Sequence, residues 1–318
     1  MPIYALGDRV PDIAVSAYVH PDAVVIGSVQ IGPESSVWPN AVLRGDDGGI
    51  RIGSRTSIQD CSVLHTTAEL DTVIGDECVV GHIAHLEGCT IEDASRLPGA
   101  SGAPGPRTVG GRARQLDLDA DRHRRATVQV HFSPTPVRRT GSTVSLVPIY
   151  ALGDEVPSID ATAYVHPDAV IIGAVTIGPE SSIWPHAVLR GDDGEIHVGA
   201  RSSIQDCTVL HTTVEDPTIV GDECVIGHIV HLEGCIVKDR AMVANGAIVL
   251  HRSVVGTGAI VAANAVVLYD VDVPPGALAV GAPATIKPDR ARMEEITRGV
   301  ATYVARAARF RKDLRRID

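Results

Sequence analysis

The stretch IVKDRAMVANGAIVLHRSVVGTGAIVAANAVV, residues 236–267, carries an aliphatic residue at every sixth position. A helix cannot use this spacing, because six residues carry it well past one turn and scatter the apolar side chains around its axis. Short strands separated by tight turns can use it, since each strand then buries one aliphatic side chain. We therefore expect a chain that turns a corner every six residues. The aliphatic positions are Val237, Val243, Val249, Val255, Val261 and Val267.

The same period extends toward the N-terminus of this region, with glycine often following the aliphatic residue, as in Ile177–Gly178 and Val198–Gly199. Glycine is favoured at a corner because it carries no Cβ. Three such hexads, about eighteen residues, complete one triangular coil of a β-solenoid. Only 3% of residues are aromatic while 44% are hydrophobic, which suits a thin aliphatic core. A sandwich of short strands would instead show alternation of apolar and polar residues.

The chain contains this pattern twice. Residues 3–93 recur as residues 149–239 with identical residues at most positions. We call the two expected β-helices that contain these stretches the first and second copies. Every His, Cys and Glu between Cys61 and Cys89 reappears between Cys207 and Cys235. The chain is therefore read as a partial tandem duplication.

Four segments are expected from this pattern. Residues 1–95 form a truncated β-helix copy, residues 96–147 a disordered linker rich in Pro, Gly and Arg, residues 148–284 a complete β-helix, and residues 285–318 a C-terminal amphipathic helix. The helix is predicted to open at Pro288 and to pack its apolar stripe along the solenoid. That stripe comprises Met293, Ile296, Val300, Tyr303, Val304, Ala307, Phe310 and Leu314.

Composition narrows the setting of the protein. A net charge of −11 disfavours nucleic acid as a partner, because phosphates require clustered cations. No apolar run is long enough to span a membrane and no signal peptide is visible, so we expect a cytoplasmic protein without a membrane partner. The six cysteines fall three per copy without Cys-x-x-Cys pairs, which predicts small buried side chains rather than disulfides.

Histidines and a carboxylate gather on one side of the second copy. His211 and Glu233 each follow an inward aliphatic residue, one coil and a short loop apart. We expect their side chains to point outward and to stack about one strand spacing, 4.8 Å, from each other. His231 lies two residues before Glu233 on the same strand, and His228 lies near the preceding corner. Imidazole and carboxylate are the ligands that a catalytic zinc takes, with a fourth position left for water.

Four motifs together resemble the γ-class carbonic anhydrases. They are RGD at Arg190–Asp192, IQD at Ile204–Asp206, VLH at Val209–His211 and GHIVHLEGC at Gly227–Cys235, and the resemblance covers residues 149–318 and 3–93. It implies a left-handed parallel β-helix that associates as a homotrimer. Each metal, Zn²⁺ or Fe²⁺, would lie between neighbours with two ligands from one subunit and one from the next. It also implies hydration of carbon dioxide to bicarbonate through a metal-bound hydroxide.

Carried across by this resemblance, His211 and the residue at position 233 are the ligands from one subunit, and His228 reaches the neighbour's site. The family pattern has His where this chain has Glu233, and a His occurs here two residues earlier, at His231. Two sets stay open: His211, His228 and His231, which we favour slightly, or His211, His228 and Glu233. In the first set Glu233 would act as a supporting group or proton acceptor. The first-copy equivalents are His65, His82, His85 and Glu87.

The resemblance also implies catalytic roles outside the metal shell. Gln205 would hydrogen-bond the bound water or substrate, Arg190 and Asp192 would pair across or brace the interface, and Asp206 would support that network. The remaining histidines of the second copy, His166, His186, His197 and His251, are expected on the surface or in turns.

Two other functions remain open. Hexapeptide-repeat solenoids include acyltransferases, which would need a histidine facing a coenzyme A groove and would leave the histidine cluster unexplained. A noncatalytic binding or assembly module could keep a metal for structure alone. For the assembly, one chain could supply two of the three β-helix positions of the ring. Alternatively, three second copies form the ring while the first copy, lacking a cap and a helix, stays unfolded, and we favour this second arrangement.

Overall fold

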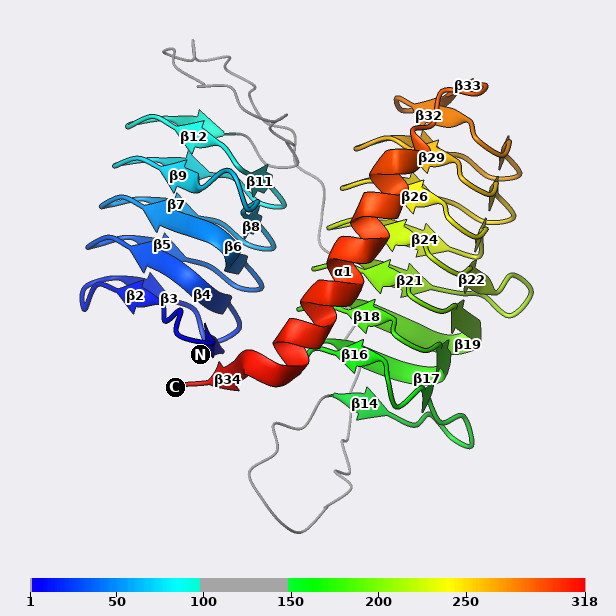
Figure 1. Ribbon diagram of the computed structural model, residues 1–318, viewed down its shortest axis with the longest axis horizontal. Coiled ribbons are helices and arrows are strands. Elements are labelled where there is room, and N and C mark those ends of the chain that lie inside the picture. Colours follow the sequence, from blue (N-terminus) through cyan, green and yellow to red (C-terminus); the bar gives the residue numbers. More distant parts are fainter. Residues whose placement is uncertain (1, 98–147, 318) are drawn as a thin grey trace, which may run out of the picture.

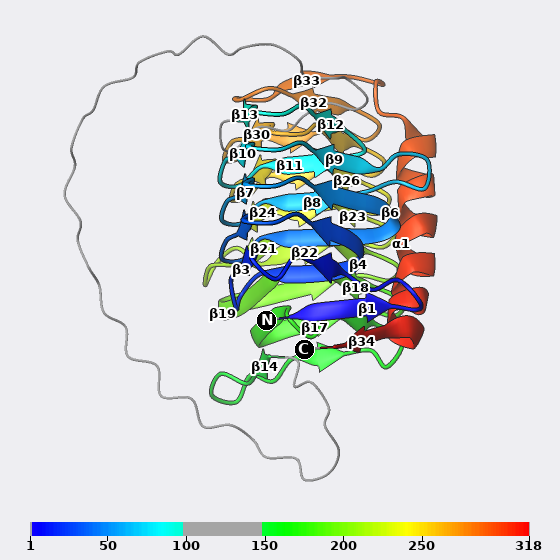
Figure 2. The ribbon, with the colours of Figure 1, turned by 90° about the vertical axis from the view of Figure 1, so that its left-hand side faces the viewer.

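The computed structural model describes residues 2–97 and 148–317, which form two stacks of parallel β-coils lying side by side (Figure 1). Both copies are folded, and the coils of each wind as a left-handed β-helix. One long helix, α1 (Met293–Asp313), runs along the second stack and ends beside the first (Figures 1 and 2). The fold class predicted from the sequence is confirmed.

The first copy contains thirteen short strands and builds one sheet with β11-β8-β6-β4-β1 in order and a second with β13-β10-β7-β5-β3. Its strands are β1 (Ile3–Leu6), β2 (Asp12–Ile13), β3 (Tyr18–Val19), β4 (Val24–Ile31), β5 (Ser36–Val37), β6 (Val42–Ile52), β7 (Ser57–Ile58), β8 (Val63–His65), β9 (Thr72–Ile74), β10 (Val79–Val80), β11 (His85–Glu87), β12 (Thr90–Ile91) and β13 (Arg96–Leu97).

The second copy repeats this order and continues for further coils, giving a 12-stranded and an 8-stranded sheet. Its strands are β14 (Ile149–Tyr150), β15 (Ser158–Ile159), β16 (Tyr164–Val165), β17 (Val170–Ile177), β18 (Ser182–Ile183), β19 (Val188–Val198), β20 (Ser203–Ile204), β21 (Val209–His211), β22 (Thr218–Val220), β23 (Val225–Ile226), β24 (His231–Glu233), β25 (Ile236–Val237), β26 (Met242–Val243), β27 (Ile248–Val249), β28 (Val254–Val255), β29 (Ile260–Val261), β30 (Val266–Val267), β31 (Asp272–Val273), β32 (Leu278–Val280) and β33 (Thr285–Lys287).

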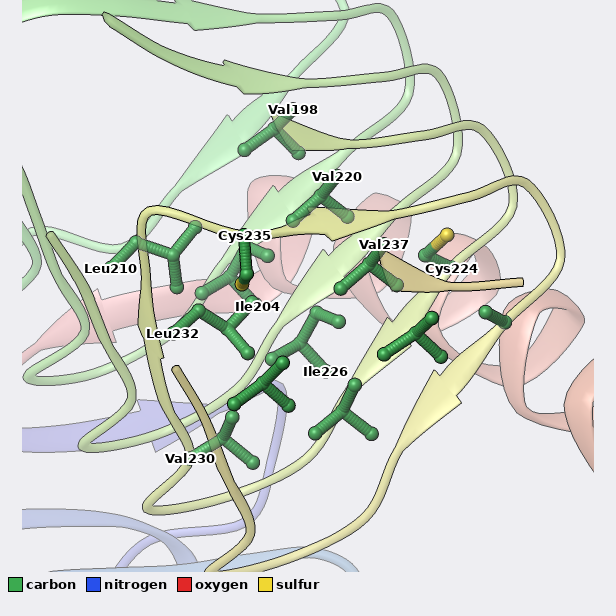
Figure 3. Close-up of a cluster of buried hydrophobic side chains, with 14 of the residues drawn as sticks. Val198, Ile204, Leu210, Val220, Cys224, Ile226, Val230, Leu232, Cys235 and Val237 are labelled. Atoms are coloured by element: carbon green, nitrogen blue, oxygen red, sulfur yellow. The ribbon is translucent and has the colours of Figure 1, made fainter. Parts of the chain in front are cut away.

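The aliphatic residue of each hexad points inward and is buried. Figure 3 shows this core in the second copy, where residues such as Leu210, Leu232 and Val237 fill the space between the three walls. Cys224 and Cys235 belong to the same core, in line with the prediction of buried small side chains. At the corners the coils approach closely: a Cβ on Gly199 would lie 2.6 Å from the Gly221 carbonyl carbon, so only glycine allows this stacking.

The C-terminal segment differs from the prediction in two ways. Helix α1 begins at Met293 rather than near Pro288, because Thr285–Lys287 first forms β33, which pairs antiparallel with β32. After the helix, β34 (Leu314–Arg316) pairs antiparallel with β1 of the first copy. The N-terminal strand edge of the first copy is therefore covered by the other end of the chain.

The expectation that the first copy stays unfolded is wrong. It misses the cap that β34 provides, which the sequence cannot reveal because β34 lies far from the first copy along the chain. Most of the predicted linker, residues 98–147, lies outside the described residues. Within the described part of the chain, no helix is long and apolar enough to cross a membrane.

Candidate metal centre at the seam between the two copies

Two kinds of surface meet where the copies touch. The strand surface is the outward side of β1, β4, β6, β8 and β11 in the first copy, and of β14, β17, β19, β21 and β24 in the second. The corner surface consists of the turns at residues 20–23, 38–41, 59–62 and 81–84 in the first copy and 166–169, 184–187, 205–208 and 227–230 in the second. The strand surface of the first copy packs against the corner surface of the second, and we call this contact the seam.

Apolar side chains fill the lower part of the seam. Tyr4 donates a hydrogen bond through its hydroxyl to Asp168 at 2.8 Å, and its ring lies edge-on to His166 at 5.3 Å. Helix α1 closes the seam from the outside. The buried cluster comprises Tyr4, Leu6, Val24, Ile26, Val42 and Val63 of the first copy with Tyr164, Trp184, Tyr303, Ala307 and Phe310 of the second copy and its helix.

Three histidines meet in the upper part of the seam. The ring of His228, from the second copy, stacks on that of His85 at 4.9 Å between centroids and 21° between planes. The same ring lies 5.6 Å from that of His65. Asn245 connects the two sides, since its side-chain oxygen accepts the His228 backbone N–H at 3.0 Å and its Nδ2 lies 3.3 Å from His85 Nδ1. A side chain of the second copy thus enters the histidine group of the first.

Strand register decides which residue faces His65. In the parallel pair β8–β11, His65 lies opposite Glu87 and Val63 lies opposite His85. Glu87 Oε1 is 3.2 Å from His65 Nδ1, as expected for stacked outward residues on adjacent strands. The pair β21–β24 has the same register, with His211 opposite Glu233. The carboxylate, rather than the histidine two residues earlier, is therefore the direct neighbour of the VLH histidine in both copies.

A buried charge network surrounds the histidines. Arg44 Nη2 lies 3.4 Å from Asp206 Oδ2 across the seam, and that oxygen is 2.8 Å from His228 Nδ1. Asp46 Oδ1 lies 3.0 Å from His65 Nε2. Burial alone would raise the pKa of Asp46 and Asp206, but Arg44 and the neighbouring histidines lower both well below the usual range. Both carboxylates are therefore ionised at neutral pH.

Helix α1 adds two arginines to this network. Arg306 Nε lies 3.2 Å from Asp46 Oδ2, and Arg306 also pairs with Asp47. Arg309 Nη1 donates to Asp47 Oδ1 at 2.9 Å. The helix of the second copy thus compensates the charge of two aspartates in the first copy.

Two of the seam histidines, His85 and His228, are suited to be neutral ligands. Burial and the neighbouring His228 together lower the pKa of His85 to about 3. Burial also lowers the pKa of His228, against the opposing effect of Asp206. His85 Nε2 is buried and has no hydrogen-bond partner among the described residues. A buried nitrogen of this kind is an available donor for a cation.

The second copy presents the same strand-surface residues, and among the described residues no β-helix packs over them. His211 Nδ1 lies 3.1 Å from Glu233 Oε1, and His211 Nε2 lies 3.1 Å from Asp192 Oδ1. His231 Nε2 lies 3.2 Å from Glu233 Oε2, and Arg190 pairs with Asp192 in its own copy. These residues form an open half of the arrangement seen at the seam.

The predicted site residues are thus divided between two places. His228 does not meet His211 or His231 of its own copy but the first-copy histidines, as the resemblance implies for neighbouring subunits. Asp206 joins the network there, and Gln205 is buried beside it on the corner surface. The cross-interface pairing expected of Arg190 is made by its first-copy counterpart Arg44. His82, the counterpart of His228, is exposed and lies 2.8 Å from Asp60.

One histidine, His166, differs from the sequence prediction. His251 lies in a turn as predicted, and its Nε2 also lies 3.6 Å from Glu233 Oε2 while its ring stacks on Tyr269. It follows Glu233 by eighteen residues, one coil of three hexads, so its spacing could have revealed this contact. His166 is fully buried against Tyr4 of the first copy, which no local signal indicates. His197 remains partly exposed beside Glu195, as expected.

Two further groups have donor atoms within 4.8 Å of one another: Asp46, Asp47 and His65, and Asp192, Asp193 and His211. In the first group the arginines of helix α1 already occupy the carboxylates, which disfavours a second cation there. The seam histidines with Glu87 combine donor atoms of both copies, and we take them as the candidate metal centre.

The fold and the seam together define a hexapeptide-repeat β-helix protein with a histidine and carboxylate centre between two neighbouring β-helices. No family model matches the chain. A probable carbonic anhydrase of Methanocaldococcus jannaschii is 48% identical over 118 residues, 37% of this chain and 74% of that protein. The chain therefore belongs to the γ-class carbonic anhydrase-like family of hexapeptide-repeat proteins.

Two other proteins are similar to this chain over about half of its length. Mitochondrial gamma carbonic anhydrase 2 of Arabidopsis thaliana is 36% identical over 162 residues, 49% of this chain and 56% of that protein, so the match spans little more than half of the relative. A Bacillus cereus crystal structure described as a candidate acetyltransferase is 32% identical with a TM-score of 0.50, covering 52% of this chain and 96% of the other.

Proposed function

We propose that the protein is a metal-dependent carbonic anhydrase that hydrates carbon dioxide to bicarbonate at the seam between its own two copies. The observation that carries this proposal is the entry of His228 between His65 and His85, which brings ligands from two β-helices to one place. The names of the relatives support the reaction. Zn²⁺ is the proposed metal, with Fe²⁺ as the alternative.

The donor set fits such an ion. His65 and His228 supply one imidazole from each copy, and the third ligand is Glu87 or His85. The strand register supports Glu87, because it lies opposite His65 and faces its Nδ1. Asp46, on the other ring nitrogen of His65, would then hold the ring in orientation. The unpartnered Nε2 supports His85 as the alternative.

When bound, the metal supplies a water whose pKa is lowered toward about 7. The chain provides the surroundings in which this chemistry can occur. Apolar residues of the seam and helix α1 exclude bulk water from one side, which strengthens electrostatic interactions. Asp206 Oδ2 lies 2.8 Å from His228 Nδ1, and Arg44 balances the charge of Asp206 and Asp46. Gln205 is placed beside Asp206, where we propose that it orients substrate.

The homotrimer implied by the resemblance takes a different form in this proposal. One chain supplies two neighbouring β-helices of such a ring, so one complete centre needs no second molecule. The half-centre at His211 and Glu233 needs another β-helix to bring a counterpart of His228. We propose that the seam is the active centre of the isolated chain.

The proposal is tested by stopped-flow carbon dioxide hydration with zinc-loaded and iron-loaded chain, together with metal analysis. We expect bound metal and hydration by the wild type, and loss of both in His228→Ala. His82→Ala is the matched control, because this counterpart is exposed and outside the seam. A metal-free protein after reconstitution would contradict the proposal, whereas tight metal without turnover would favour the noncatalytic module.

One observation favours the alternative function, that of an acyltransferase: the similarity to the Bacillus cereus structure. An assay of acetyl transfer from acetyl coenzyme A to small amines, on the metal-free chain, separates the two functions. Transfer that persists in His228→Ala and needs no metal would favour that reading.

A further inference from the structure

The side chain of Asn245 joins the second copy to His85 of the first, and the orientation of its amide is determined by its contacts. The backbone N–H of His228 can only donate, so the atom that receives it at 3.0 Å is the amide oxygen Oδ1. The amide nitrogen Nδ2 therefore points the other way and lies 3.3 Å from His85 Nδ1. Because an amide nitrogen only donates, His85 Nδ1 accepts this hydrogen bond and carries no proton.

The single proton of the neutral His85 ring is therefore on Nε2. A doubly protonated ring would set a second N–H against the amide of Asn245, so the same contact disfavours the imidazolium. Nε2 is buried and has no hydrogen-bond partner among residues 2–97 and 148–317. Burial alone leaves this nitrogen as a candidate metal ligand, but the hydrogen bond at Nδ1 makes it an N–H donor that lacks an acceptor. Such a donor is costly to bury unless a ligand accepts its hydrogen bond.

The other two histidines of the seam have their protons placed by carboxylates. Asp206 Oδ2 lies 2.8 Å from His228 Nδ1, and Asp46 Oδ1 lies 3.0 Å from His65 Nε2. An ionised carboxylate only accepts, so each fixes a proton on the ring nitrogen beside it. The lone pairs of the neutral rings are then on His228 Nε2 and on His65 Nδ1.

The lone pair of His65 Nδ1 faces a second acceptor. Glu87 Oε1 lies 3.2 Å away, and two acceptors at this distance repel each other unless a cation lies between them. The separation suits two ligands of one tetrahedral zinc, which at about 2.0 Å from the ion lie about 3.3 Å from each other. His65, Glu87 and His228 are thus prepared as ligands, and His85 is prepared as a donor.

The second copy shows the same ring in another hydrogen bond. His231, the counterpart of His85, has its Nε2 3.2 Å from Glu233 Oε2, so the carboxylate on its own strand can accept the N–H. At the seam Asn245 holds the ring by its other nitrogen, and Nε2 is left for a ligand.

We propose that Asn245 is a positioning residue that holds His85 as the Nε2–H tautomer, and that this N–H donates to an oxygen of bicarbonate bound at the seam. His85 and Glu87 are outward residues of the same strand, and the His85 ring stacks on that of His228 at 4.9 Å, so the donor belongs to the same group of side chains as the ligands. The role toward bicarbonate rests on the proposed function, whereas the tautomer does not.

The tautomer is read in metal-free, full-length protein labelled with ¹⁵N-histidine, because protonated and unprotonated ring nitrogens give well-separated signals in ¹H–¹⁵N NMR spectra. Loss of signals in His85→Gln assigns them to this ring. Asn245→Asp keeps the shape of the side chain but replaces its donor with an acceptor. Asn245→Ala removes the contact without adding a charge. Asn264→Asp, the same change at an exposed corner residue of the following coil, is the control.

We expect the proton on His85 Nε2 in the wild type and in Asn264→Asp. It should move to Nδ1 in Asn245→Asp, because the carboxylate can only accept, and both tautomers should be populated in Asn245→Ala. Thermal unfolding confirms that each variant is folded. A proton on Nδ1 in the wild type, or an Nε2–H tautomer that is unchanged in both Asn245 variants, overturns the positioning role.

Zinc affinity tests whether the tautomer keeps His85 out of the ligand set. His85→Ala should leave the affinity of the wild type nearly unchanged. In the Asn245→Asp background, where the lone pair is on Nε2, the same substitution should weaken zinc binding by about tenfold. A strong loss of affinity from His85→Ala in the wild type would overturn the assignment of His85 as a donor.

Bicarbonate added to the zinc-loaded protein tests the role of the donor. The His85 Nε2–H proton signal should shift to lower field as bicarbonate is added to the wild type, and no such shift should occur in Asn245→Asp. An unmoved signal in the wild type overturns the role toward bicarbonate. A chain that binds no zinc contradicts the proposed function, but the tautomer is still decided by the spectra of the metal-free protein.

Discussion

The two copies carry nearly the same residues in different surroundings, and the surroundings decide what each residue contributes. Arg44 is fully buried and bridges Asp46 and Asp206, whereas its counterpart Arg190 is partly exposed and pairs with Asp192. The hexads specify the coil in both copies equally. Burial of the outward side chains depends instead on which β-helix or helix lies against them. The repeat sequence alone therefore does not determine how much each outward side chain contributes to the free energy of unfolding.

Helix α1 is the second source of this difference. It covers Trp184, which lies edge-on to Phe310 at 5.0 Å and under the Arg44 guanidinium at 4.5 Å. The counterpart Trp38 remains exposed in the described part of the chain, and its indole N–H is donated to serine hydroxyls. Each residue pair thus offers a matched experiment within one chain.

The arginine pair should give the largest difference. Arg44→Ala leaves the buried carboxylates of Asp46 and Asp206 without their shared cation, and breaking a buried ion pair costs about 3–5 kcal/mol of unfolding free energy. Arg190→Ala removes a solvent-exposed pair and should cost less than about 1 kcal/mol. Urea unfolding of both variants measures the difference. Equal losses would show that the seam is not formed in solution.

The buried His166 should make the stability of the protein depend on pH. Burial lowers the pKa of His166 to about 3, below the unfolded value of about 6.5. The neutral ring therefore stabilises the fold above pH 6.5 or so, and this contribution, about 2–4 kcal/mol, is lost as the pH falls toward 3. Unfolding free energies measured across this range should fall less steeply in His166→Gln than in the wild type.

The third ligand should be revealed by Glu87 and His85. If the carboxylate faces the ion, as the strand register favours, Glu87→Ala should weaken zinc binding by about tenfold or more, while His85→Ala should weaken it less. Competition with a chromogenic chelator measures the affinity. The opposite order would assign the ligand to His85. Loss in Glu233→Ala, the second-copy control, would instead place the measured ion at the open half-centre.

The sequence predicts the coil and the ligand types, because both depend on local spacing. The six-residue period places Leu210 and Leu232 inside and His211 and Glu233 outside on adjacent strands, and the structure has this register. The six-residue period alone could not predict that His228 meets His65, because that contact joins residues far apart in the chain; only the family resemblance implied a contact of this kind, between neighbouring subunits. The cap provided by β34 and the pairing of Arg306 with Asp46 were not predictable for the same reason. Packing between separate β-helices leaves no periodic signal.

The prediction with the smallest expected effect concerns an ion pair whose surroundings are alike in the two copies. Arg55 pairs with Glu77 and Arg201 pairs with Glu223 at matching positions on exposed walls of the two copies. Solvent screens both pairs, so neither contributes much to stability. Arg55→Ala and Arg201→Ala should therefore shift the urea midpoint slightly and equally. A clear difference between them would mean that the copies differ in their intrinsic stability, and the larger contrasts at Arg44 and His166 could then no longer be assigned to the seam.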